Sequence, residues 1–171
     1  MIASSACKRA SGLYLTDVSQ ERLYEWSLKE NLNIVKSCKT IICRGSNMKT
    51  TVEMYKELSA AWQFPYYFGW NAAAVVDCLS DLAWMPASIY NLIIYDADML
   101  LMHEPISEII GLFADFQEVA RRWREDMPSV MSPQHPLRFQ VILQVSPGNA
   151  LPYEHALTNP PQYLSSLAVL D

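Results

Sequence analysis

Positive charge is missing from the middle of this sequence. No lysine or arginine occurs in residues 57–120, a tract of 64 residues that carries nine of the 18 aspartates and glutamates. Such a tract cannot pair its carboxylates internally, so they need partners elsewhere in the chain, in solvent or on another molecule. Its negative field attracts cationic partners and repels nucleic acid. The alternative interpretation is an acidic surface that serves only solubility.

Long apolar runs are also absent. No stretch approaches the roughly 18 consecutive apolar residues that a membrane-spanning helix requires. The first 15 residues place the basic pair Lys8-Arg9 after small residues, with no apolar stretch behind it, which does not fit a signal peptide. We therefore expect a cytoplasmic protein that does not bind a membrane and, with a formal charge of −5, does not bind nucleic acid.

Cysteine, histidine and glycine are too few or too scattered to build the common cofactor sites. The four cysteines, Cys7, Cys38, Cys43 and Cys78, lack metal-type spacing, which favours reduced thiols over a disulfide framework. The three histidines show no ligand spacing, and the five glycines are too far apart to form a phosphate-binding loop. We expect neither a metal nor a cofactor.

Segments typical of strands and helices alternate along the chain, and 51% of the residues are hydrophobic, which is enough for a core. The alternation predicts an α/β fold with a small, mainly parallel sheet packed with helices. We expect strands at residues 12–16, 33–43, 91–95 and 138–145, and helices within 19–32, 50–63, 71–82 and 104–124.

The first helix has a modest apolar stripe. Tyr24, Leu28 and Leu32 recur at i, i+4 and i+8, which predicts that they face the core, with Leu23 and Trp26 to the sides of the stripe. At the level of domains, we expect a short N-terminal segment at 1–10, one domain at 11–146, and a proline-containing C-terminal tail at 147–171.

Two features invite an enzymatic interpretation. Asp96 and Asp98 directly follow an apolar strand, where a phosphatase would place a nucleophilic carboxylate and its Mg²⁺ ligands. Such an enzyme also needs a later lysine, and none follows Lys56. The alternative is that the two aspartates cap the next segment or lie at the surface. Cys78 could be a thiol nucleophile, but its helical spacing favours an inert core position.

The helix that contains Cys78 has two unlike faces. On a 3.6-residue wheel, Val75, Cys78, Leu79 and Leu82 share one side, which predicts the buried face. The opposite side carries acids with a large aromatic residue at each end, a composition typical of protein interfaces. The residues of this outer side are Trp70, Ala73, Asp77, Asp81 and Trp84, with Ser80 beside them.

The stretch from Phe64 to Pro86, FPYYFGWNAAAVVDCLSDLAWMP, resembles the barstar family of intracellular inhibitors of a secreted ribonuclease. The family's pattern is close to F-P-x-Y-F-G-x-N-W-D-A-L-x-D-C-L-x-D-L-x-W-L-P. This chain keeps Phe64, Pro65, Tyr67, Phe68, Gly69, Asn71, Ala74, Asp77, Cys78, Leu79, Asp81, Leu82, Trp84 and Pro86. The opening strand and helix are similar to those of the longer bacterial members, so the resemblance covers roughly residues 11–146, and we expect a barstar-like domain there.

The resemblance implies that the loop and the helix after Phe64 plug the active site of a cationic ribonuclease. Asp77 corresponds to the family's principal carboxylate, which mimics a substrate phosphate, and Glu118 to an outlying acidic contact. The expected partner-binding residues are Tyr67, Phe68, Gly69, Trp70, Asn71, Ala73, Ala74, Asp77, Ser80, Asp81, Trp84 and Glu118.

Two departures from the family pattern bear on the target. Ala72 and Ala73 replace a Trp-Asp pair, which removes a second inhibitory carboxylate, and Arg122 stands where the family has an acid. Both departures argue against the usual ribonuclease target of the family. They remain compatible with an acidic face that blocks some other basic toxin. The sequence thus predicts a non-enzymatic bacterial immunity protein of a toxin–antitoxin pair. The alternatives are a barstar-fold adaptor for a basic protein that is not a nuclease, and a Mg²⁺-dependent phosphatase.

Overall fold

The structure is a computed structural model that describes residues 12–32, 37–125, 138–149 and 151–164. A five-stranded sheet forms its centre, and every strand pair in it is parallel. The strand order is β2-β3-β4-β1-β5. The strands are β1 (Gly12–Thr16), β2 (Cys38–Arg44), β3 (Ile89–Tyr95), β4 (Arg138–Gln144) and β5 (Gln162–Tyr163). The α/β fold with a small parallel sheet is confirmed.

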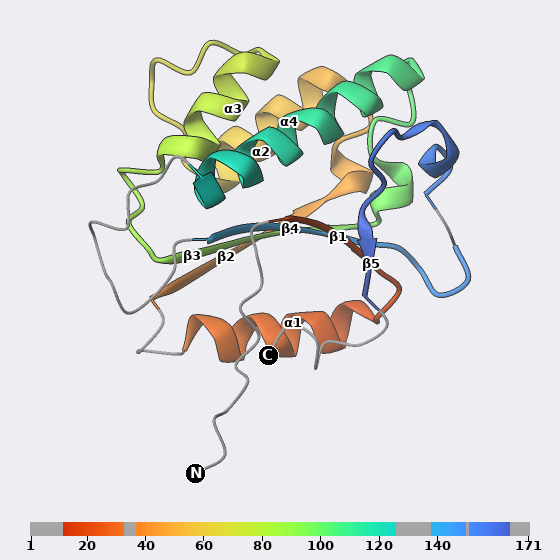
Figure 1. The fold of residues 1–171 in the computed structure, drawn as a ribbon, viewed down its shortest axis with the longest axis horizontal. Coiled ribbons are helices and arrows are strands. Elements are labelled where there is room, and N and C mark those ends of the chain that lie inside the picture. The colour runs from red at the N-terminus through yellow and green to blue at the C-terminus, as the bar shows by residue number, and fades with distance from the viewer. Residues whose placement is uncertain (1–11, 33–36, 126–137, 150, 165–171) are drawn as a thin grey trace.

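Helices cover both faces of the sheet (Figure 1). The helix α1 (Gln20–Asn31) lies alone on one face, and α2 (Thr51–Ala61), α3 (Ala72–Asp81) and α4 (Ile106–Glu125) cover the other. Coverage of both faces explains why every residue of β3 is buried and why its sequence is a continuous apolar run with one asparagine.

Three of these helices begin at a residue whose side chain caps the helix N-terminus. Ser19 and Asn71 accept a backbone N–H of the first turn of α1 and α3, respectively. Thr50 and Glu53 form a capping box at the start of α2, in which each side chain accepts the other residue's backbone N–H. The predicted helix starts near Ser19, Thr50 and Asn71 are confirmed.

The prediction for the buried face of α1 is wrong. Tyr24, Leu28 and Leu32 are exposed, Leu32 to 78%, whereas Leu23 and Trp26 are buried against the sheet. The buried stripe is Leu23, Trp26, Ser27 and Glu30, which also has helical spacing. Trp26 offers more apolar area than any residue of the predicted stripe, and its burial rotates the helix toward that side.

Part of the segment after β4 packs on the domain. Leu151 and Tyr153 join the larger core cluster, and the Tyr153 hydroxyl donates to the Ala97 carbonyl at 3.1 Å. Leu164 is buried against α1 and β1, and its N–H donates to the Leu15 carbonyl. Residues 1–10, predicted as a separate segment, lie outside the described residues.

Three of the cysteines, Cys38, Cys43 and Cys78, are buried free thiols; Cys7 lies outside the described residues. Burial raises the pKa of the Cys43 thiol to about 12, and burial, with Asp77 and Asp81 nearby, also raises the pKa of the Cys78 thiol. Cys78 is therefore a core residue, as its spacing predicts, and not an activated nucleophile. In the described part of the chain, no helix combines the length and the apolar character needed to cross a membrane.

Candidate protein-binding site

An aromatic loop lies between α2 and α3. Tyr66, Tyr67 and Trp70 are exposed, with 62% of Tyr67 and 57% of Trp70 accessible. Phe68 is buried between them and contacts Phe64 and Trp70, with ring centroids 4.9 and 5.2 Å away. The loop therefore exposes large aromatic side chains to solvent, while the buried Phe68 packs it onto the domain. Exposed aromatic residues of this kind are typical of protein-binding surfaces.

The turn that leads into α3 is fixed by Asn71. Its Oδ1 accepts the N–H of Ala74 at 2.9 Å, and its Nδ2 donates to the Gly69 carbonyl at 3.1 Å. Trp70, between the two, has a φ of 52°, in the left-handed region that disfavours side chains with a Cβ. The indole is therefore held outward by a backbone conformation that the Asn71 bonds stabilise.

The outer side of α3 carries the predicted acids. Asp77 and Asp81 are exposed, and the Asp77 side chain is 74% accessible. Ala73 is exposed one turn before Asp77, so no second carboxylate stands there, and Ala74 is half-buried. The expectation that Ser80 lies beside the outer side is wrong: Ser80 is buried, and its Oγ has no hydrogen-bond partner among the described residues.

Trp84 and Trp70 belong to one aromatic cluster, although they stand at opposite ends of α3. Phe64 contacts both Phe68 and Trp84, so a chain of ring contacts runs from Trp84 through Phe64 and Phe68 to Trp70. The indole N–H of Trp84 donates to the Trp62 carbonyl at 3.0 Å, and its side chain is half-buried. Of the two tryptophans, Trp70 is the one that faces solvent.

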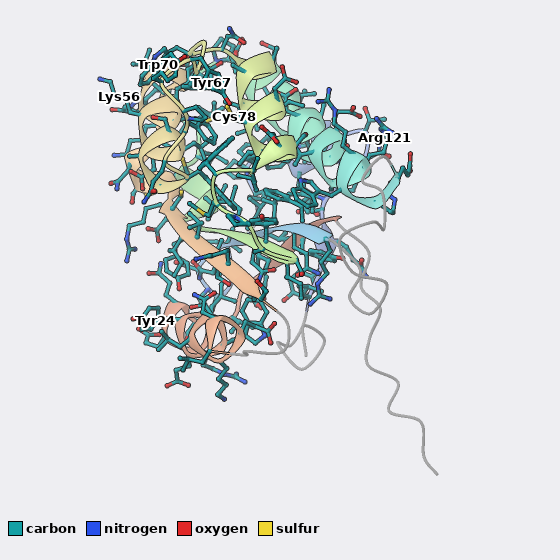
Figure 2. All side chains as sticks on the ribbon, turned by 90° about the vertical axis from the view of Figure 1, so that its left-hand side faces the viewer. Tyr24, Lys56, Tyr67, Trp70, Cys78 and Arg121 are labelled. Atoms are coloured by element: carbon teal, nitrogen blue, oxygen red, sulfur yellow. The ribbon has the colours of Figure 1, made fainter. Side chains whose placement is uncertain are left out.

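Two arginines of α4 meet the acids of this surface. Arg122 donates from Nη1 to Asp77 Oδ1 at 3.1 Å and from Nε to Glu118 Oε1 at 3.0 Å. Arg121 holds the same Glu118 with two hydrogen bonds of 2.8 and 2.9 Å, and also pairs with Glu125. Figure 2 shows Arg121 on the opposite side of the helical layer from Tyr67 and Trp70, so the surface has an aromatic end and a charged end.

The arginines change the electrostatics of the expected site. Hydrogen bonds from Arg121 and Arg122 lower the pKa of Glu118 to about 2. Asp77 and Glu118 both lie in the tract without lysine or arginine. Both pair with Arg122, which follows that tract in the next helical turn of α4. The Arg121–Glu118 and Arg122–Glu118 pairs have helical spacing and could have been predicted. The Arg122–Asp77 pair joins residues 45 apart and needs the packing of α3 on α4.

Asp96 and Asp98 have other partners at the carboxyl ends of the strands. Asp96 accepts from Gln20 at 2.8 Å and from Ser46 at 3.3 Å, and Arg44 lies 3.6 Å away. Asp98 accepts from Asn149 at 3.1 Å. Within the described ranges, no group of three or more histidine, cysteine or acidic side chains is arranged to hold a metal ion. These hydrogen bonds and the ion pair form a polar network that links the carboxyl ends of neighbouring strands.

The parallel α/β fold thus exposes aromatic and charged side chains on α3 and the loop before it. The sequence model of the family described as Barstar (barnase inhibitor) matches residues 38–132. The chain therefore belongs to the barstar family. A search of curated proteins finds no match.

The matched range contains β2, α2, α3, β3 and α4, and thus the whole candidate surface. The strand β1 and helix α1 precede it, and β4 and β5 follow it. The extent of the barstar-like domain at 11–146 therefore stays a prediction at both ends.

Proposed function

We propose that this protein is a barstar-type inhibitor: a cytoplasmic immunity protein that binds a cationic ribonuclease toxin and covers its active site. The family supplies the general class, because its sequence model is described as an inhibitor of barnase. The single observation that carries the proposal for this chain is the position of Asp77. It is 74% exposed at the centre of the outer face of α3, directly beyond the aromatic loop.

The proposed mechanism is occlusion, without a chemical step. A ribonuclease site is built from cationic side chains that bind RNA phosphates and from surfaces on which bases stack. Asp77 offers a carboxylate in place of a phosphate, and Tyr67 and Trp70 offer aromatic rings in place of bases. Asp81 adds a second exposed acid on the same helix, whereas Glu118 on α4 is already paired with Arg121 and Arg122.

The test begins with capture of the partner from the native cell on the immobilised protein. The captured protein is then purified, and its isoelectric point and ribonuclease activity are measured with and without the inhibitor. We expect a basic ribonuclease whose activity falls to background at one equivalent of inhibitor. A partner without nuclease activity, or a nuclease that stays active in the complex, would refute the proposal.

One observation favours the second candidate, an adaptor that binds a basic protein other than a nuclease. Ala73 leaves α3 with a single carboxylate at its centre, and Arg122 already pairs with it. The negative charge available to imitate RNA is therefore smaller than the composition of the acidic tract suggests. The same capture experiment separates the two candidates by the partner's activity.

A further inference from the structure

We propose that Arg122 determines partner specificity: it selects a partner that brings an acidic group to Arg122 together with a cation to Asp77, and it disfavours partners that bring cations alone. The inference rests on the proposed function only in taking α3 as the centre of the binding surface. It adds which charged groups a partner must bring to this surface.

The argument starts from the position of Arg122 between two carboxylates on different helices. Its Nη1 lies 3.1 Å from Asp77 Oδ1, and its Nε lies 3.0 Å from Glu118 Oε1. Arg122 is only one-third exposed, because it lies along the contact between α3 and α4. Two helices thus hold the guanidinium in place, and its position does not depend on a partner.

This placement satisfies Asp77 only in part. The Asp77 Oδ2 atom makes no hydrogen bond or ion pair in the described part of the chain, and the side chain remains 74% exposed. Asp77 therefore still accepts a donor from outside. A partner lysine or arginine that approaches it also approaches Arg122, and the two like charges repel each other.

Arg122 in turn keeps donors for a partner. A guanidinium has five N–H donors, and the two intramolecular bonds use one on Nε and one on Nη1. A partner carboxylate placed against the remaining donors completes the pairing of Arg122 and relieves the repulsion felt by the partner's cation. The matching surface is therefore an acid and a base side by side, and not a purely cationic cleft.

The neighbouring positions agree with this chemistry. Ala73, one turn before Asp77, adds no carboxylate that would outweigh Arg122. Glu118 is already shared by Arg121 and Arg122, so it does not offer a free charge to a cationic partner. The charged end of the surface is thus nearly balanced, with both signs fixed by hydrogen bonds.

The test uses barnase as a cationic probe, with four forms of the full chain: wild type, Arg122→Ala, Arg122→Glu and Arg124→Ala. Arg124 is the matched control, because it lies in the same turn of α4 and pairs with Glu125 instead of Asp77. We expect Arg122→Ala to tighten barnase binding at least tenfold and Arg122→Glu to tighten it further. Arg124→Ala should change it less than threefold.

A second comparison tests whether the effect runs through Asp77. In the Asp77→Ala background, replacement of Arg122 by alanine should no longer tighten barnase binding. Thermal melts of each form check that the fold persists.

Equal gains from Arg122→Ala and Arg124→Ala would overturn the inference, because general charge alone would then explain them. Absence of barnase binding by every form would overturn it too, because Arg122 would then not be what excludes that target. These outcomes are independent of the proposed function. A captured partner without nuclease activity refutes that function but leaves the barnase series intact.

Discussion

At the residue scale, Asp77 is the side chain on which the proposed inhibition depends. Asp77→Ala removes one exposed ion pair, with Arg122, so we expect the free energy of unfolding to change by less than about 1 kcal/mol. In the complex, the loss strands the partner's cation, so binding should weaken by about 2–5 kcal/mol, chiefly through faster dissociation. Urea unfolding and surface-plasmon off-rates measure the two effects.

Ala73→Asp is the companion substitution for that measurement. It restores the acid of the family pattern at an exposed position, so the fold should tolerate it. We expect it to strengthen binding to barnase, because the added carboxylate lies one turn from Asp77 and is not paired with Arg122. Unchanged binding of Asp77→Ala to the captured partner would place the inhibitory surface elsewhere on the molecule.

Two glycines show how differently one residue type is used. A Cβ on Gly45, in the short 3₁₀ turn Gly45–Asn47 after β2, would collide with the Asp96 carbonyl at the end of β3. Gly111 lies on the exposed side of α4, and a Cβ there meets no atom within 4 Å. We expect Gly45→Ala to destabilise the fold by about 2 kcal/mol or more, since backbone must move. Gly111→Ala should stabilise it by about 0.5–1 kcal/mol through helix propensity.

Chemical unfolding of both glycine variants measures these changes, and each serves as the control for the other. A Gly45→Ala protein as stable as wild type would show that the contact between the ends of β2 and β3 relaxes easily. Loss of stability in Gly111→Ala would mean that α4 does not present that side to solvent.

At the scale of elements, the pairing within α4 predicts a pH dependence. The pKa of Glu118 is lowered from 4.5 to about 2 by Arg121 and Arg122. A lowered folded-state pKa gives stability that is fully present above the unfolded value, near pH 4.5, and is lost as the pH falls to about 2. We expect Glu118→Gln to be less stable than wild type at pH 7, and the difference to shrink between pH 4.5 and pH 2.

Urea unfolding at a series of pH values measures this difference. Glu25→Gln on α1 is the control, because Glu25 is exposed and its carboxylate makes no hydrogen bond or ion pair with described residues. At pH 7 its stability should differ little from that of wild type. A Glu118→Gln difference that persists unchanged at pH 2 would contradict the arginine pairing.

The two amphipathic helices α1 and α3 differ in how well their sequences predict the buried face. In α3, Val75, Cys78, Leu79 and Leu82 are apolar and the opposite side is polar or small, so only one orientation buries a core. In α1, apolar residues occur on two sides, with Leu23 and Trp26 on one and Tyr24 and Leu28 on the other. Which side of α1 is buried depends on how the helix packs on the sheet. The sheet in turn forms by the pairing of strands that are distant in the sequence.

At the scale of the whole molecule, folding pairs some carboxylates of the acidic tract and leaves others exposed. Asp77 pairs with Arg122 and Asp96 with Arg44, so residues outside the tract neutralise part of its charge. Asp81 and Glu108 are exposed, and their carboxylates have no ion pair with described residues. We propose that these exposed carboxylates give the molecule a negative field that steers a cationic partner.

This remaining field predicts a salt-dependent association rate. The Debye length falls from about 10 Å at 0.1 M salt to about 3 Å at 1 M, so long-range attraction fades over that range. We expect the on-rate for a cationic partner to fall by at least tenfold while the off-rate changes much less. Stopped-flow association at several salt concentrations measures both, and an on-rate that does not depend on salt would show that the tract only aids solubility.

The order of β1 to β4 and of the helices, the three capped helix starts and the buried face of α3 follow from the sequence, because they depend on neighbours within about one helical turn or on local alternation. The exposure of Asp77 follows in the same way, since its helix has only one apolar side. The strand β5 lies in the segment that the sequence predicts as a tail. The burial of Ser80, the orientation of α1 and the Arg122–Asp77 pair depend on segments far apart in the chain. The helix wheel places Asp77 at the surface, but the packing of α3 on α4 sets its charge environment, because residues 45 positions apart come within hydrogen-bond distance only in the folded protein.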